Sequence, residues 1–180
     1  MADQLPELTE ELTNWIEAQH IFFVASAAQE GRINLSPKGQ ESLHVCSPNE
    51  LIWLNLTGSG NETAAHLKQS NRLTLMWCAF EGPPRILRIY GSAQTIHPRD
   101  SAWQECAALL PPPLGARQYY RVQIELVQTS CGYAVPMMEF TEERKVLEMW
   151  SEKKGQAGIE AYWEEKNQLS IDGTPTGIVD

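Results

Sequence analysis

The stretch "LIWLNLTGSGNETAAHLKQSNRLTLMWCAFEGPPRILRIYGSA", residues 51–93, is the part of this chain that decides its fold class. Three short runs rich in β-branched and aromatic residues account for most of it: ELIWLNL at residues 50–56, NRLTLMWCAF at residues 71–80 and PRILRIYGSAQTI at residues 84–96. Turn chemistry such as FEGPP separates the last two runs. One helical stretch, NETAAHLKQS, interrupts them. Because strand-like runs at hairpin distances pair antiparallel, we expect an antiparallel barrel rather than a parallel α/β sheet.

The segments on both sides extend this pattern. HIFFVASA and GRINLSPKG are two more strand-like runs before the quoted stretch, and QYYRVQIELVQTSCGYAV is one after it. LPELTEELTNWIEAQ has apolar residues at helical spacing, with Thr9 and Thr13 available for capping, and PRDSAWQECAALL is a further helical stretch. We therefore predict a mainly β fold with flanking helices, in a single domain over residues 1–180 with a helical C-terminal extension from about residue 141.

The composition argues against several classes of protein. With 42% hydrophobic residues the 180-residue chain can bury a core, and a net charge of -9 without a concentrated basic patch argues against nucleic-acid binding. No window approaches a membrane span, and the acidic start MADQLPELTEELTNW lacks the layout of a signal peptide, so we expect a cytoplasmic protein without membrane association. The four cysteines form no CxxC pair and have no histidine at ligand spacing, which argues against a metal site or a disulfide framework.

A glycine-rich bend, Gly58, Ser59 and Gly60, comes directly before the expected helix start at Asn61. Such a bend points several backbone N–H groups the same way, and a helix end adds partial positive charge, so together they favour an anion such as a phosphate. The motif is not a complete G-x-G-x-x-G and lacks the G-K-[ST] of a nucleotide P-loop. The alternative is a capping box, in which Ser59 and Glu62 cap the helix and bind nothing.

Polar residues on two expected strands add to the candidate site. Asn34 and Ser36 alternate with apolar neighbours, so one face of that strand is polar up to Lys38. Lys38 is either an exposed turn lysine or a ligand contact. Arg88 lies in mid-strand on the face opposite its two apolar neighbours, where either solvent or a pocket surrounds it.

The order of these segments resembles that of the pyridoxamine 5'-phosphate oxidase-like family of FMN-binding split β-barrels, over about residues 20–175. The segments that carry the resemblance are FFVASAAQEGRINLSPKG, the quoted stretch, TSCGYAVP and SIDGTP. The resemblance implies a homodimer with two FMN molecules at its interface, in which strand residues such as Trp77 and Arg88 contribute to a site completed by the partner chain. The residues that it places against FMN are Asn34, Leu35, Ser36 and Lys38 along the ring and ribityl chain, Thr57, Gly58, Ser59, Gly60, Asn61 and Thr63 around the phosphate, and Arg88 beside the phosphate or the ring.

The chain departs from the true pyridoxamine phosphate oxidases of that family in two places. Glu62, Thr63 and Ala64 stand where those oxidases place a pair of basic residues, so the bend, the helix end and Arg88 would have to neutralise the phosphate. The C-terminal QLSIDGTPTGIVD does not resemble the oxidase segment that helps to hold pyridoxal substrate. We therefore expect a branch of the family distinct from the true oxidases.

The predicted function is that of an FMN-dependent oxidoreductase with a small-molecule redox substrate, because a flavin carries the redox chemistry and the protein mainly orients it. A nicotinamide or deazaflavin donor is compatible with this prediction, and the sequence does not identify the acceptor. Two alternatives stay open. One is a flavin-binding stress protein without turnover, and the other is a haem-handling relative, which needs an axial histidine that none of the four histidines indicates by its spacing.

Overall fold

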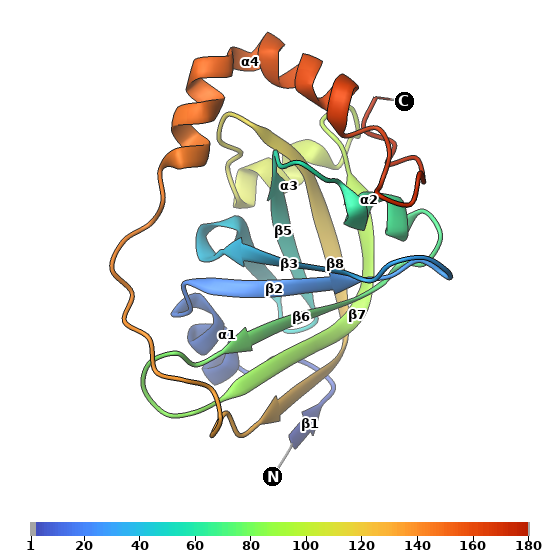
Figure 1. The fold of residues 1–180 in the computed structure, drawn as a ribbon. Helices are drawn as coiled ribbons and strands as arrows, with labels where there is room; N and C mark the ends of the chain where they lie inside the picture. The colour runs from blue at the N-terminus through green and yellow to red at the C-terminus, as the bar shows by residue number, and fades with distance from the viewer. Residues whose placement is uncertain (1–2, 180) are drawn as a thin grey trace.

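The computed structural model describes residues 3–179, which form one curled antiparallel sheet with helices around it (Figure 1). The strands are β1 (Asp3–Leu5), β2 (Ile21–Ser26), β3 (Asn34–Gly39), β4 (Leu43–Ser47), β5 (Glu50–Leu56), β6 (Arg72–Cys78), β7 (Ile86–Ile96) and β8 (Ala116–Ser130). Their order is β3-β2-β6-β7-β8-β5-β4, and β1 pairs with β8 beside this path. The predicted antiparallel, mainly β fold is confirmed, although the sequence did not indicate the short strands β1 and β4.

The helical elements are α1 (Glu10–Glu17), the 3-10 turn η1 (Gln40–Ser42), α2 (Glu62–Leu67), α3 (Trp103–Leu109) and α4 (Val146–Lys166). α1 begins as the sequence predicts, because the hydroxyl of its N-cap Thr9 accepts a hydrogen bond of 3.2 Å from the backbone N–H of Leu12. α4 consists of two helical pieces joined at Gly155, whose φ of 65° is left-handed. The C-terminal part becomes helical at Val146, after an irregular segment over residues 131–145.

The core fills the inside of the curled sheet. β2 buries every second side chain, the alternation expected of a strand with one face toward the core. Large aromatic rings dominate this core: Phe22 stacks on Trp77 with 5.6 Å between ring centroids, and Trp53 stacks on Tyr120 at 4.4 Å. α1 adds its apolar face to the same cluster.

The register between β2 and β3 decides which side chains of β3 point inward. Asn34 lies opposite Ser26, Ser36 opposite Val24, and Lys38 opposite Phe22. Directly opposite residues share a face of a sheet, so the three polar side chains of β3 lie on the same side as the buried residues of β2. Leu35 is opposite Ala25 and lies on the outer face.

The outer face runs across β3, β2, β6 and β7. Arg88 of β7 is opposite Met76 of β6, which is itself opposite Phe23 of β2, so Arg88 shares the outer face with Leu35. Trp77 is next to Met76 in β6 and therefore points inward, where it is 1% exposed. This burial argues against a contribution of Trp77 to a site completed by the partner chain, because the ring packs in the core of its own chain.

α4 crosses one end of the curled sheet, and the chain end then returns beside α2 (Figure 1). α4 buries Ile159 and Trp163, which form a small cluster with Ile178. The irregular segment that precedes α4 runs along the outside of the molecule before reaching this position. None of the helices within residues 3–179 combines the length and the apolar character that crossing a bilayer requires.

Candidate functional site

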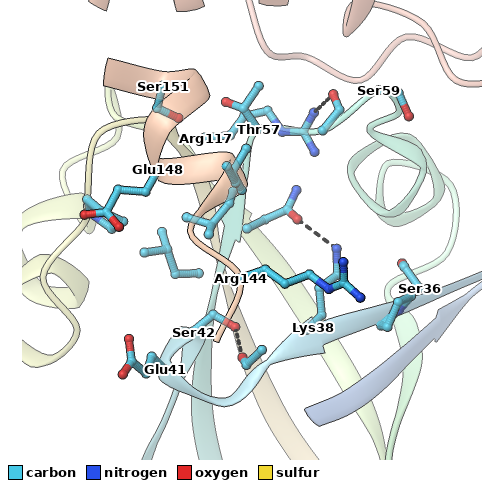
Figure 2. Close-up of a pocket in the computed structure, with 18 of the residues that line it drawn as sticks. Ser36, Lys38, Glu41, Ser42, Thr57, Ser59, Arg117, Arg144, Glu148 and Ser151 are labelled. Carbon is cyan, nitrogen blue, oxygen red and sulfur yellow. Dashed lines mark hydrogen bonds between the residues drawn. The ribbon is translucent and has the colours of Figure 1, made fainter. Parts of the chain in front are cut away.

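A cavity of about 1230 Å³ opens between β3, the end of β5, the bend after β5, and the start of α4 (Figure 2). Nine of the eleven residues that the sequence analysis placed against a cofactor line it: Asn34, Ser36, Lys38, Thr57, Gly58, Ser59, Gly60, Asn61 and Thr63. Leu35 and Arg88 do not line it. Leu35 is 64% exposed on the outer face, and the Arg88 guanidinium lies 3.4 Å from the hydroxyl of Ser130.

Lys38 extends from β3 into the cavity (Figure 2). Its Nζ donates a hydrogen bond of 3.2 Å to Oδ1 of Asn55 and lies 5.0 Å from the centroid of the Trp53 ring. Burial and, to a smaller extent, the positive charge of Arg117 lower the pKa of Lys38 from its ordinary value to about 8. Among the residues that the structure describes, Lys38 forms no ion pair, so no carboxylate lies within 4.0 Å of its ammonium.

Arg117 is a second cation in the cavity, and the sequence analysis did not identify it. It is 2% exposed, and its Nη1 lies 2.8 Å from Oδ1 of Asn167 and 3.5 Å from the carbonyl oxygen of Gly58. Its Nε has no hydrogen-bond partner, and burial lowers the pKa of Arg117 to about 10. Like Lys38, it forms no ion pair within residues 3–179. The sequence signal that could have identified Arg117 is a cation within a strand whose other residues are mostly buried, because a buried charge is rare unless it is paired.

The bend does not act as a capping box. The N-cap of α2 is Asn61, which makes no side-chain cap hydrogen bond, and the carboxylate of Glu62 accepts from the backbone N–H of Ile171 instead. Asn61 is buried, with its Oδ1 accepting from Gln118 and its Nδ2 lacking a partner. An unpartnered donor in a buried position is costly unless a ligand or water satisfies it, so this amide supports a binding role for the bend.

Thr63 joins β3 to α2 at the edge of the cavity. Its Oγ1 lies 3.3 Å from Nδ2 of Asn34 and 3.2 Å from Oγ of Ser26. The Ser26 hydroxyl is in turn 3.0 Å from Nδ1 of His66, which is buried behind the bend. The described cavity lining includes none of the four histidines of the chain.

The remaining wall of the cavity comes from segments that sequence reasoning left out. Pro111, Pro113 and Leu114 form an apolar side, and residues 143–152 form a charged one. In Figure 2 the side chain of Arg144 extends toward that of Lys38, whereas Glu148 lies on the far side of the cavity. These residues are distant in sequence from the bend, and only the path of α4 across the sheet brings them there.

The curled antiparallel sheet with flanking helices is the architecture of split-barrel proteins. A putative pyridoxamine 5'-phosphate oxidase from Lactobacillus delbrueckii superposes with a TM-score of 0.52 at 23% identity, covering 68% of this chain and 94% of that one. HutZ, the heme storage protein from Vibrio cholerae, superposes with a TM-score of 0.50 at 16% identity, covering 71% of this chain and 98% of that one. At these identities the likeness concerns the fold alone.

The family follows from the sequence comparisons. The sequence model of pyridoxamine 5'-phosphate oxidase matches residues 8–131, and the chain therefore belongs to that family. The pyridoxamine 5'-phosphate oxidase family protein ustO from Aspergillus flavus is 37% identical over 139 residues, which cover 74% of this chain and 56% of ustO. The chain thus spans little more than half the length of this relative. The resemblance noted from the sequence is confirmed.

The lowered pKa of Lys38 predicts how the stability of the chain depends on pH. Lys38 has a pKa of about 8 in the folded chain, against about 10.4 for an unfolded lysine, so the unfolded chain binds more protons between these values. The free energy of unfolding of the wild type should therefore rise relative to that of Lys38→Met as the pH increases from about 8 to about 10. Urea denaturation in phosphate-free buffer measures this difference.

The control is Lys153→Met, which removes the same charge from an exposed position on α4. Its difference from the wild type should stay constant over this pH range. If the stability curves of wild type and Lys38→Met run parallel from pH 7 to pH 10, burial does not perturb Lys38 as described.

Proposed function

We propose that this chain is an FMN-binding oxidoreductase that acts on a small-molecule redox substrate. The observation that carries the proposal is the pair of cations, Lys38 and Arg117, held without ion-pair partners in one cavity beside the bend. Neither has a carboxylate within ion-pair distance in the described chain, although glutamates such as Glu41 and Glu148 line the same cavity, and a bound anion would supply the missing partner. Because the chain belongs to the pyridoxamine 5'-phosphate oxidase family, we infer that this anion is the phosphate of a flavin.

The residues present fit the phosphate of FMN. The true oxidases of the family place a basic pair at the start of the phosphate-binding helix, and this chain has Glu62 and Thr63 there. Arg117 from β8 and Lys38 from β3 supply positive charge to the same cavity from other elements. We thereby assign Lys38 to the phosphate, whereas the family resemblance placed it along the ring and ribityl chain. Their guanidinium and ammonium groups, with the buried amide of Asn61, offer the charge-assisted hydrogen bonds that a phosphate dianion favours.

The size of the cavity supports a second ligand beside the flavin. Its volume of about 1230 Å³ exceeds the range of roughly 300–1,000 Å³ that is usual for a site holding one small molecule. A bound flavin supplies the transfer of electrons, and the protein holds it and shapes access to it. Pro113, Leu114 and the start of α4 line the same cavity. We assign the access side to this wall, because Glu148, at the start of α4, lies across from Ser59 and Lys38 in Figure 2.

We also propose that the chain forms a homodimer through the outer face of the sheet. Leu35 exposes 64% of its surface there, beside half-buried apolar residues such as Phe23 and Met76, and Ile33, directly before β3, is 76% exposed. Contiguous apolar surface of this kind favours association. Such an interface would bring Leu35 and Arg88, which do not line the cavity of their own chain, against the partner chain.

No specific observation favours the haem alternative. HutZ is similar in fold, but the cavity described here has no histidine in its lining and therefore no axial ligand of that type. The four cysteines are free thiols, which is compatible with the reducing cytoplasmic location expected from the sequence. A flavin-binding protein without turnover remains the alternative, and it differs from our proposal in kinetics rather than in binding.

The phosphate site predicts that FMN binds at least about 10-fold more tightly than riboflavin, since a charge-assisted hydrogen bond contributes about 1.5–3 kcal/mol. Lys38→Met should weaken FMN by about 10- to 100-fold and leave riboflavin nearly unchanged. The wild-type preference for FMN should also decline as the pH rises through about 8, where Lys38 loses its proton. Titrations that follow flavin fluorescence measure both affinities, with Lys153→Met as the charge-matched control. Equal affinities of the wild type for the two flavins would refute the phosphate site.

Turnover separates the oxidoreductase from the non-catalytic alternative. Under anaerobic conditions the FMN-loaded protein should lose its oxidised flavin absorbance on addition of NADH, NADPH or a reduced deazaflavin, and recover it on addition of an acceptor. Free FMN at the same concentration is the control for reduction in solution. If bound flavin is reduced no faster than free flavin by any of the three donors, the protein binds FMN without acting as a reductase.

The homodimer predicts a light-scattering mass of about twice the 20.3 kDa chain mass at low micromolar concentration. Ile33→Glu combined with Leu35→Glu should give a folded monomer, because both positions are exposed in the single chain and a charge costs little there. Leu109→Glu, on the exposed side of α3, is the control and should leave the dimer intact. A wild-type monomer, or a double variant that remains dimeric, would exclude this interface.

A further inference from the structure

Asn167, the residue directly after α4, lies behind the bend and contacts it with its whole side chain. Its Nδ2 donates to the carbonyl oxygens of Gly58 at 3.0 Å and Ser59 at 3.4 Å, and its Oδ1 accepts from Nη1 of Arg117 at 2.8 Å. Asn167 is fully buried, at 0% exposed. One amide therefore holds both the bend and the buried cation, although it does not line the cavity itself.

Because the peptide bond is planar, this contact fixes the direction in which two backbone N–H groups of the bend point. In a planar trans peptide the C=O of one residue and the N–H of the next point in opposite directions. Because Asn167 holds the carbonyl oxygens of Gly58 and Ser59 on its own side, the N–H groups of Ser59 and Gly60 point away from it. Ser59 and Gly60 line the cavity, so these donors lie on the side where an anion would bind.

Trp163, one turn earlier in α4, holds the start of the same bend. Its indole Nε1 donates to Oγ1 of Thr57 at 2.8 Å, and the Thr57 hydroxyl donates to the carbonyl oxygen of Gly115 at 2.8 Å. The backbone N–H of Thr57 donates to the same carbonyl at 2.9 Å. Trp163 thus holds Thr57, directly before the bend, and Asn167 holds the first two residues of the bend.

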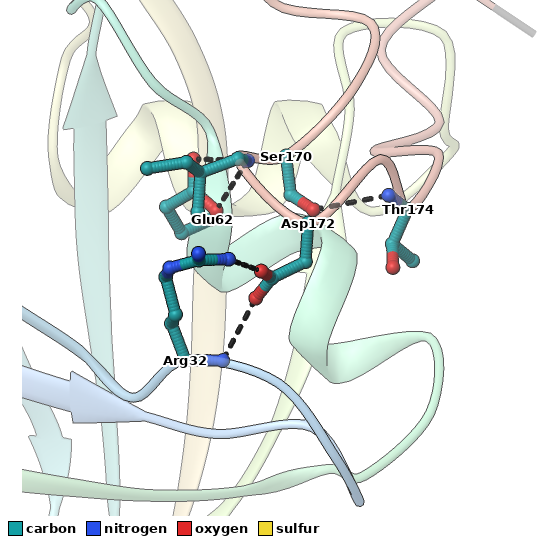
Figure 3. Close-up of polar contacts among 6 residues, drawn as sticks. Arg32, Glu62, Ser170, Asp172 and Thr174 are labelled. Carbon is teal, nitrogen blue, oxygen red and sulfur yellow. Dashed lines mark hydrogen bonds and ion pairs between the residues drawn. The ribbon is translucent and has the colours of Figure 1, made fainter.

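The turn after α4 is itself anchored, which keeps Asn167 in place (Figure 3). Asp172 pairs with the guanidinium of Arg32 and accepts from its backbone N–H, and this ion pair ties the turn to the segment before β3. The backbone N–H of Ile171 donates to Glu62 of α2. The Thr176 hydroxyl donates to the backbone carbonyl of Asn167 at 2.6 Å.

We propose that Asn167, with Trp163, is a positioning residue for the phosphate of a bound phosphate monoester, and that the C-terminal segment is thereby part of the binding site. This inference rests on the proposed FMN function and adds to it a region beyond residues 8–131, the part that matches the family. Asn167 fixes the orientation of the bend donors and holds Nη1 of the Arg117 guanidinium beside the bend. Its effect falls on the phosphate and not on the isoalloxazine ring.

The test compares FMN with riboflavin in Asn167→Leu, which removes every side-chain hydrogen bond at similar volume. FMN affinity should fall by about 10-fold or more while riboflavin affinity changes less than about 2-fold, because only FMN carries the phosphate. Trp163→Phe removes the indole donor and keeps a ring in place, and it should reduce the preference for FMN by a smaller factor. This second variant tests the same positioning effect if Asn167→Leu does not fold.

Gln168→Leu is the matched control, because it removes a neighbouring side-chain amide that bonds to the backbone carbonyl of Glu164 in α4 and not to the bend. It should leave the ratio of the two affinities unchanged. If the wild type prefers FMN and both α4 variants keep the full preference, Asn167 and Trp163 are structural and this inference is overturned. If the wild type shows no preference for FMN, the proposed phosphate site itself fails, whatever the variants do.

Discussion

The burial of two positive charges, those of Lys38 and Arg117, in one cavity is the constraint on which the rest of the site depends. A charge removed from water is costly unless a partner compensates it, and neither Lys38 nor Arg117 has a carboxylate within ion-pair distance in the described chain. Neutral groups take that role in part: the amide oxygens of Asn55 and Asn167, the carbonyl of Gly58 and the face of Trp53. The lowered pKa of both cations shows that this compensation is incomplete. An anion bound in the cavity would complete the compensation of the two positive charges, so the stability of the site would depend on whether an anion is bound.

The sheet makes this arrangement through its register. In β3 the side-chain period of two places Asn34, Ser36 and Lys38 on the cavity side and leaves Leu35 outside. A slip of one residue would reverse every one of these positions and expose the lysine. The Thr63 hydroxyl, bonded to Asn34 and Ser26, and the Asp172–Arg32 ion pair hold the start of β3 against α2 and the C-terminal turn. Cavity and outer face are thus two sides of one sheet, with binding proposed on one and association on the other.

Most of the fold followed from local pattern, and local pattern together with the family resemblance selected nine residues that line the cavity. The corrections share one cause. Ser59 and Glu62 have the spacing of a capping box, yet Glu62 bonds to Ile171, which is 109 residues away. Trp77 sits on a strand that could face either way, and the neighbouring strands turn it into the core. Arg88 looked like the missing phosphate cation, but its face of the sheet is opposite to the cavity, and Arg117 stands there instead.

The sequence by itself determined what depends on near neighbours: the strands and their alternation, the Thr9 cap of α1, and the position of the glycine bend before α2. These features arise from dihedral preferences and from hydrogen bonds over a few residues, so a short window contains their cause. Tertiary structure alone decided that Arg117 stands beside Gly58, that Asn167 holds the bend, and that α4 closes the cavity. Those contacts join residues 50 to 109 positions apart, and their partners are chosen by how the sheet curls and where α4 crosses it, which no local pattern specifies.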